Sequence, residues 1–291
     1  MFLQQLLNGI MIGSVYALTA MGATLIYGIL RILDIANAGA YVAGAYFGWF
    51  IYFKTGNLIL AFLISMAITG LIGVLLHKFI YAPILSKPRI LPIVPLVASV
   101  GLFTLSGDLA RLIAGPGTKA YNVDFGTEVI NIGKLTVVPA WILIIVLTAL
   151  LFTILWLILN RTKLGLAWRA TAEDSDIAQA MGVNTKSAMA LSYILGYGFA
   201  AAAGIMVGIL YNSITPALGE VPSYKMLSII VLGGLGSPVG TVIAGLFIGL
   251  AETMFSAYNL AFIPKDSIAF IVLILVLLIK PSGLISKSNN I

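Results

Sequence analysis

The sequence contains no cysteine and very little charge. Without cysteine the chain can form neither a disulfide framework nor a thiolate metal site. Only 9% of its 291 residues are charged, whereas soluble domains carry about 25%. No nucleophile–base–acid set or metal-ligand spacing is present, so we expect no catalytic residue, metal site or cofactor in this chain. Residues 1–5 lack the basic region of a cleavable signal peptide, and we expect the first apolar segment to be retained.

Apolar residues are abundant instead: 60% of the chain is hydrophobic and the mean hydropathy is +1.09. A helix needs roughly 20 mostly apolar residues to cross a bilayer. The sequence therefore predicts an all-α membrane protein, a polytopic helical bundle that forms one transmembrane domain over residues 1–291 in contact with lipid. Its apolar segments, about eight in number, are residues 5–30, 37–53, 58–80, 90–113, 139–160, 187–211, 226–257 and 266–280.

The positive charge of the chain, 16 − 10 = +6, lies mainly on loops. Basic residues gather on the cytoplasmic side of membrane proteins, so the charge does not indicate a nucleic-acid partner. We place the 77–89 and 161–186 loops and the C-terminal tail inside, and the 114–138 and 212–225 loops outside, and we leave the side of Met1 open. The residues that carry this assignment are His77, Lys78, Lys87, Arg89, Arg161, Lys163, Arg169, Lys186, Lys280 and Lys287.

A run of helix breakers, LGGLGSPVG at 232–240, interrupts the seventh apolar segment. Glycine and proline disfavour a continuous helix there. We expect residues 226–235 to dip inward and residues 239–257 to return to the outer side. Irregular backbone at membrane depth needs protein or a water-filled cavity around it, so the break is expected at a subunit interface or a transport pathway.

A weak internal repeat supports that interpretation. Residues 38–49 (AGAYVAGAYFGW) align with residues 239–250 (VGTVIAGLFIGL), and paired interrupted segments in two halves indicate the pathway of a transporter. Ordinary packing within one chain is the alternative, since small residues four apart let helices approach closely. The predicted pathway or subunit-interface residues are Asn8, Ser14, Asn37, Gly39, Gly44, Gly236, Ser237, Gly240 and Thr241.

The stretch RATAEDSDIAQAMGVNTK, residues 169–186, is a charged loop between apolar segments. Thr171 and Asp174 have the spacing of a capping box, and Gly182 is a typical helix stop. A short helix over residues 172–181 follows, with Ile177, Ala178 and Met181 on a mildly apolar face. Such a helix suits docking of a soluble partner; a solvated connector and a lipid-surface helix are the alternatives.

Ionisable residues inside apolar segments are functional candidates by default. Asp34 follows Arg31 by three residues, and Asp108 and Arg111 have the same spacing, so we expect two structural ion pairs. Glu252 is either interfacial or faces a partner subunit. His77 is expected to be an interfacial residue rather than a proton relay.

Four stretches resemble the permease subunits of ABC importers of the branched-chain amino-acid type. They are AEDSDIAQAMGVN (172–184), YAPILSKPRILP (81–92), VLGGLGSPVGTVIAGLFIGLAE (231–252) and the opening spans over residues 6–46. The resemblance covers nearly the whole chain, and the four motifs stand in the family's order.

The resemblance implies a non-catalytic subunit of a prokaryotic inner membrane that works with several partners. These are a second, homologous but non-identical permease, two cytoplasmic ATPase subunits and an extracytoplasmic binding protein that delivers a small-molecule substrate. The 172–181 helix would sit in a groove of one ATPase. The implied ATPase-coupling residues are Glu173, Asp174, Ile177, Ala178, Met181 and Gly182.

One departure from the family pattern concerns the substrate. Where the family usually has a His-Gly-acid run, this chain has IANAGAY at 35–41. Branched-chain amino acids, other amino acids, amides and urea therefore stay open as substrates. The alternative function is a self-sufficient secondary transporter or channel for a small polar solute, which would need buried ion-coupling groups.

Overall fold

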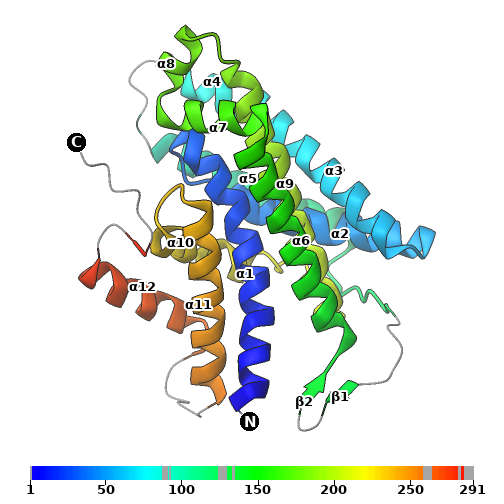
Figure 1. Ribbon diagram of the computed structural model, residues 1–291. Coiled ribbons are helices and arrows are strands. Elements are labelled where there is room, and N and C mark those ends of the chain that lie inside the picture. Colours follow the sequence, from blue (N-terminus) through cyan, green and yellow to red (C-terminus); the bar gives the residue numbers. More distant parts are fainter. Residues whose placement is uncertain are drawn as a thin grey trace.

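The computed structural model describes residues 2–86, 91, 93–123, 130–132, 135–257, 264–280 and 283–284. Each of the eight predicted apolar segments is helical, which confirms the helical bundle (Figure 1). The helices are α1 (Phe2–Leu30), α2 (Ala36–Thr55), α3 (Leu58–Leu76) with its continuation through the π-helix η1 (His77–Tyr81) and α4 (Ala82–Leu85), α5 (Ile93–Ala114), α6 (Pro139–Arg161), α7 (Lys163–Glu173), α8 (Ser175–Ala180), α9 (Thr185–Leu210), α10 (Glu220–Gly233), α11 (Pro238–Ala257) and α12 (Ser267–Ile279).

A small antiparallel hairpin joins α5 to α6 and was not predicted. Its strands are β1 (Ile130–Ile132) and β2 (Leu135–Val137), with Ile130 opposite Val137. Three-residue strands carry too little alternation to be recognised in a sequence.

Six helices in the described part of the chain are long and apolar enough to cross a membrane, namely α1, the continuous α3–η1–α4, α5, α6, α9 and α11. α7 and α8 cap one end of the bundle, here called the coupling end. The start of α1, the start of α6 and the ends of α9 and α11 meet around one cavity at the opposite end. The predicted inside residues Arg161, Lys163, Arg169 and Lys186 lie at the coupling end. The basic-residue rule therefore predicts a cytoplasmic coupling end, with the start of α1 outside.

Some residues used for the orientation cannot be compared with the structure. Lys87, Arg89 and Lys287 lie outside the described residues, as do residues 124–129 and 133–134 of the predicted 114–138 outer loop.

Two buried helices, α1 and α9, form the centre of the bundle. α1 packs against α9 and α11, and α9 packs against α2 and α3. Where α1 and α9 cross, Gly22 and Gly196 bring their backbones into direct contact. Helices without side chains at the crossing can approach this closely.

The other glycine-rich stripes also pack within the chain. Gly44 of α2 lies against Ala201 of α9, and Gly245 of α11 lies against Ala17 of α1. The two repeats thus use equivalent glycines, each against one of the two central helices. Ordinary helix packing, the alternative weighed above, accounts for these contacts.

The break in the seventh segment is confirmed. α10 ends at Gly233, Gly234 and Gly236 adopt φ values of 98° and 80°, and α11 returns antiparallel beside α10. Only glycine adopts such φ angles readily. The Ser237 hydroxyl accepts a hydrogen bond from the Gly240 backbone at 3.2 Å, which caps the start of α11.

Leu284 also forms a hydrogen bond to the end of α10 beside this break. The backbone N–H of Leu284 donates to the carbonyl oxygen of Leu232 at 2.8 Å. The last turn of a helix leaves carbonyl groups without intrahelical partners, and in a membrane protein each must find another donor. α10 begins earlier than predicted, so Lys225 lies in a helix and not in an outer loop.

Candidate functional site

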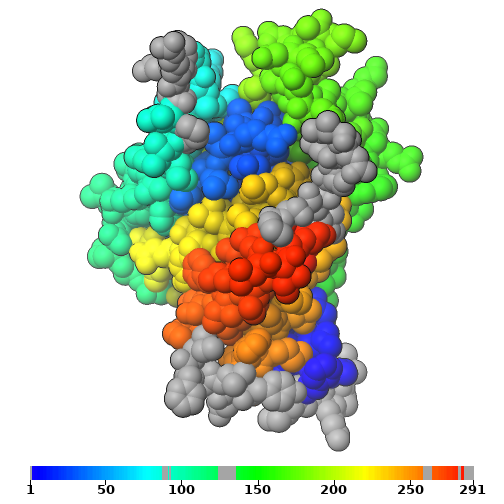
Figure 2. Space-filling model, turned by 90° about the vertical axis from the view of Figure 1, so that its left-hand side faces the viewer, coloured from blue at the N-terminus to red at the C-terminus, as the bar shows by residue number. Residues whose placement is uncertain are grey.

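The charged loop forms two helices at the coupling end rather than one. α7 ends at Glu173 and α8 begins at Ser175, so the predicted single helix over residues 172–181 is wrong. Figure 2 shows this end at the top, where the green α7–α8 segment and the cyan η1–α4 segment stand on either side of the blue junction between α1 and α2.

Asp174 causes the division between the two helices. Its Oδ1 accepts hydrogen bonds of 2.9 Å from the backbone N–H groups of Asp176 and Ile177, which makes it the N-cap of α8. Thr171 lies inside α7, and its hydroxyl donates to the Ala167 carbonyl at 2.8 Å. Aspartate caps helices at least as well as threonine, so the second residue of the predicted capping box became the cap.

Three side chains attach α7 to the membrane helices. The indole Nε1 of Trp168 donates a buried hydrogen bond of 2.7 Å to the Ser192 hydroxyl of α9. The same indole covers Gly28 of α1, where an added Cβ would come within 2.8 Å of the ring. The guanidinium of Arg31 donates to the carbonyl of Ala172 at 3.0 Å. A displacement of α7 therefore reaches both central helices directly.

α8 presents apolar side chains to solvent. Ile177 is 63% exposed and Met181 is 80% exposed, whereas Ala178 is buried. Gly182 follows with φ 83°, as expected of a helix stop. Ile177 and Met181 lie one turn apart and form an apolar surface that a soluble partner can cover. Glu173 and Asp174 lie at the junction of the two helices, and the coupling roles of all six residues stay predictions.

Asp34 connects three segments near the coupling end. Its carboxylate accepts hydrogen bonds from the Tyr81 hydroxyl of η1 at 2.6 Å, the Tyr197 hydroxyl of α9 at 3.0 Å and the backbone N–H of Ala36. The side chain is fully buried. The predicted pair with Arg31 is wrong, because Arg31 turns outward with φ 54° toward Ala172. A buried carboxylate with three donors stabilises the junction between α1 and α2.

Two further predictions about single residues can be compared with the structure. Asp108 and Arg111 form the expected pair, with 3.3 Å between Oδ1 and the guanidinium, and both side chains are more than half exposed. Such a pair contributes little to stability. The His77 ring stacks on Tyr193 with 4.8 Å between centroids.

A buried charge cluster joins α1, α10, α11 and the start of α12. The Nζ of Lys225 lies 2.8 Å from Oε1 of Glu252, 2.8 Å from Oδ1 of Asp266 and 2.7 Å from the Tyr16 hydroxyl, which in turn donates to Glu252 at 2.9 Å. Lys225 and Glu252 are almost fully buried. Sequence reasoning left Glu252 undecided and missed its partner. The signal was a lysine directly before the apolar segment 226–257 and a glutamate near the end of that segment.

The nine predicted pathway or interface residues fall into two groups. Asn8 lines the cavity at the opposite end, and Gly39 lines a second, smaller cavity of about 60 Å³ between α2 and α5. The remaining residues contact neighbouring helices or cap the break, and their roles in a pathway stay predictions: they are Ser14, Asn37, Gly44, Gly236, Ser237, Gly240 and Thr241.

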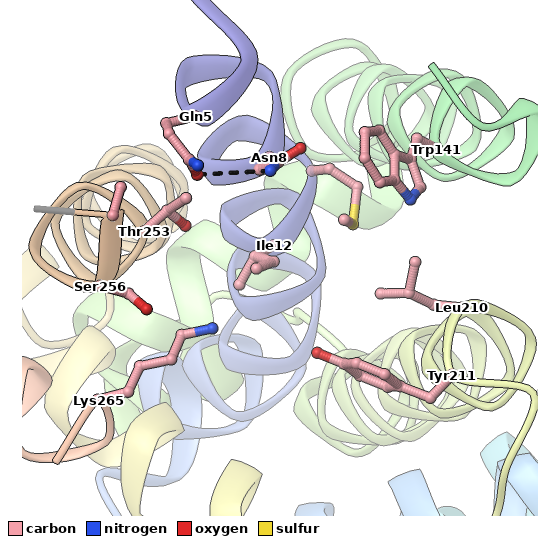
Figure 3. Close-up of a pocket in the computed structure, with 11 residues that line it drawn as sticks. Gln5, Asn8, Ile12, Trp141, Leu210, Tyr211, Thr253, Ser256 and Lys265 are labelled. Carbon is pink, nitrogen blue, oxygen red and sulfur yellow. Dashed lines mark hydrogen bonds between the residues drawn. The ribbon is translucent and has the colours of Figure 1, made fainter. Parts of the chain in front are cut away.

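The larger cavity has a volume of about 450 Å³ and lies at the end opposite α7 and α8. Figure 3 shows the side chains that line it. Asn8, Tyr211, Ser256 and Lys265 line it with hydrogen-bonding groups, and Ile12 belongs to its apolar wall. Asn8 and Ile12 both belong to α1, and the other three side chains each come from a different segment.

Comparisons with known proteins give the family of the chain. The family described as "Branched-chain amino acid transport system / permease component" matches residues 5–279. The chain is 33% identical to the high-affinity branched-chain amino acid transport system permease protein LivH of Escherichia coli K12, over 98% of this chain and 96% of the relative. It is 32% identical to the corresponding BraD of Pseudomonas aeruginosa, with the same coverage of both chains.

A more distant match is the galactofuranose transporter permease protein YtfT of Escherichia coli, 30% identical over 60% of this chain and 55% of that relative. No solved structure matches. A match over nearly the full length, together with the helical bundle and its anchored cytoplasmic loop, places the chain among the permeases. The chain belongs to the family of permease components of branched-chain amino acid transport systems, whose members are non-catalytic, multi-pass membrane subunits.

Proposed function

We propose that this chain is one permease subunit of an ATP-driven, binding-protein-dependent importer of branched-chain amino acids in a prokaryotic inner membrane. Two cytoplasmic ATPase subunits, a second permease and an extracytoplasmic binding protein complete the transporter. The observation that supports the proposal most directly is the apolar surface of Ile177 and Met181 on α8. This surface stands on a loop that hydrogen bonds attach to both central helices.

The charged groups of the membrane helices fit this function better than ion coupling. An ion-driven transporter needs buried ionisable groups that bind and release its ion. Within the described chain, the buried Lys225 and Glu252 neutralise each other, and three donors already occupy the Asp34 carboxylate. The energy for transport is therefore assigned to partner ATPases.

The absence of cysteine from the chain gives a clean test of the docking surface. Ile177→Cys and Met181→Cys place a thiol on the proposed contact, and Gln179→Cys, exposed on another side of α8, is the matched control. Each variant is treated with a short thiol crosslinker in native membranes, and adducts are identified by mass spectrometry.

The expected result is an adduct with a nucleotide-binding subunit from positions 177 and 181 and a much weaker one from 179. Free cytoplasmic labelling of all three thiols without an adduct would make the loop a solvated connector. Leucine uptake by the reconstituted complex is measured alongside. Uptake that stops when an ion gradient is removed, with ATP still present, would favour the secondary transporter.

A further inference from the structure

The cavity at the outer end of the bundle has the size and mixed lining of a small-molecule site. Its volume of about 450 Å³ lies within the range of roughly 300–1,000 Å³ typical of ligand pockets. Residues of four membrane helices, α1, α6, α9 and α11, line it together with Lys265, which lies just before α12 (Figure 3). A solute in this cavity therefore contacts several membrane helices at once.

Among the described polar side chains of the lining, one carries a positive charge and the others are neutral. Gln5, Asn8, Tyr211 and Ser256 supply neutral donors and acceptors, and Lys265 supplies one cation, whose ammonium group points into the cavity in Figure 3. Among the described residues that line the cavity, none is acidic. An ammonium group in this setting attracts a carboxylate through a charge-assisted hydrogen bond.

The buried charge cluster explains how Lys265 is held there. The next residue, Asp266, is committed to the buried ammonium of Lys225 at 2.8 Å. Thr253 lines the cavity immediately after Glu252, which belongs to the same cluster. The cluster thus fixes the backbone on one side of the cavity and leaves the acid beside Lys265 occupied, which pre-organises the cation for a ligand.

The cavity also has an apolar wall. Met11 and Ile12 of α1, Trp141 of α6 and Leu210 of α9 offer hydrocarbon surface beside the polar groups. An aliphatic amino acid has the complementary parts: a carboxylate for Lys265, an ammonium group for amide and hydroxyl oxygens, and an alkyl chain for the apolar wall.

From this arrangement we infer that the cavity is an outward-facing subsite for a neutral, aliphatic amino acid, with Lys265 as the carboxylate-binding residue. The inference rests on the proposed function and assigns a binding site and a carboxylate-binding residue to its substrate. Lys265 repels a substrate with a cationic side chain, and no described acidic lining residue compensates for that repulsion.

Protection of an introduced thiol tests the subsite without measuring transport. Ser256→Cys replaces a hydroxyl in the cavity by a thiol of similar size in a chain without other cysteines. The assembled transporter in proteoliposomes is treated with a small, membrane-impermeant methanethiosulfonate. L-leucine is expected to slow the labelling in a concentration-dependent way, and L-lysine at the same concentration is expected to leave the rate unchanged.

Lys265→Met in the Ser256→Cys background removes the charge and keeps an unbranched side chain. It should raise the leucine concentration for half protection by about tenfold or more, the effect of losing a hydrogen bond to a charged group. Lys54→Met is the matched control, since Lys54 is exposed at the end of α2 and does not line the cavity. This variant should leave the leucine concentration for half protection unchanged.

Three results would overturn the inference: a thiol at position 256 that the reagent cannot reach, labelling that leucine does not slow, or equal protection with Lys265→Met.

ATP-driven leucine import by the cysteine-free chain is the separate readout for the proposed function. Import without protection refutes the subsite alone, and failure of ATP-driven import refutes the proposed function itself. If Lys265→Met lowers import but leaves protection unchanged, the residue acts elsewhere, for example on the binding protein, and the subsite is refuted.

Discussion

Arg31 and Ala172 join the cytoplasmic loop to the first membrane helix. The guanidinium donates a hydrogen bond of 3.0 Å to the Ala172 carbonyl, which belongs to the last turn of α7. A cation is favourable at this end of a helix, because the unpaired carbonyls there carry partial negative charge. Arg31 reaches this position by adopting φ 54°, and three residues later Asp34 holds the same junction against η1 and α9.

Arg31→Gly should separate ATP hydrolysis from transport. Glycine adopts the left-handed backbone of this position without strain, so only the guanidinium contact is lost. We expect leucine import by the reconstituted complex to fall about fivefold or more, the usual size of a coupling effect, while ATP hydrolysis continues. Arg31→Lys keeps a cation and a donor and should retain most of the import. Equal import by the glycine variant would show that α7 does not act through Arg31.

Gly182 is expected to be required for its backbone conformation alone. Its φ is 83°, and no atom of the described residues lies within 4 Å of an added Cβ. Gly182→Val should impose a local cost of roughly 1–2 kcal/mol, displace the end of α8 and reduce coupling. Gly182→Asn tolerates the left-handed region and should import normally. The two variants are compared by ATPase activity, leucine import and thermal unfolding, and a deficit of equal size in both would refute this explanation.

The buried pair of Lys225 and Glu252 gives a prediction about stability. Lys225→Met leaves Glu252 buried without its cation, and breaking such a pair costs roughly 3–5 kcal/mol. Lys225→Met with Glu252→Gln removes both charges and should regain most of the loss. Thermal unfolding in detergent measures both variants. A double variant as unstable as the single one would mean that the pair does more than neutralise charge.

The crossing of α1 and α9 should tolerate no side chain. An added Cβ at Gly22 collides with the carbonyl oxygen of Gly196. Gly22→Ala should therefore destabilise the bundle by roughly 1–3 kcal/mol, as overpacking does. Gly101→Ala in α5 is the control, since no described atom lies within 4 Å of a Cβ there. A similar unfolding temperature for both variants would contradict the close crossing.

The predictable part of this fold is the part that depends on local composition. Hydropathy located the eight apolar segments, because membrane helices are built from long apolar runs whichever helices they pack against. The break before α11 was also predictable, since Gly234 and Gly236 need φ angles that favour glycine.

The pairing of side chains across helices was not predictable in the same way. Asp34 bonds to Tyr81 and Tyr197 rather than to Arg31, because burial among three segments decides its partners. The sequence predicted the α8 surface from Ile177 and Met181, but it did not show that Ala178 faces the protein. One capping residue, Asp174, divides the single helix that the sequence predicted into α7 and α8.

The hydrogen bond between Leu284 and Leu232 has a consequence for biosynthesis. Leu284 follows Leu232 by 284 − 232 = 52 residues, so α10 is made before the donor for this carbonyl has been translated. Proteins fold largely from the N-terminus as they are made. The rest of the bundle can therefore begin to assemble early, whereas the end of α10 gains this hydrogen bond only after α11 and α12 have been made.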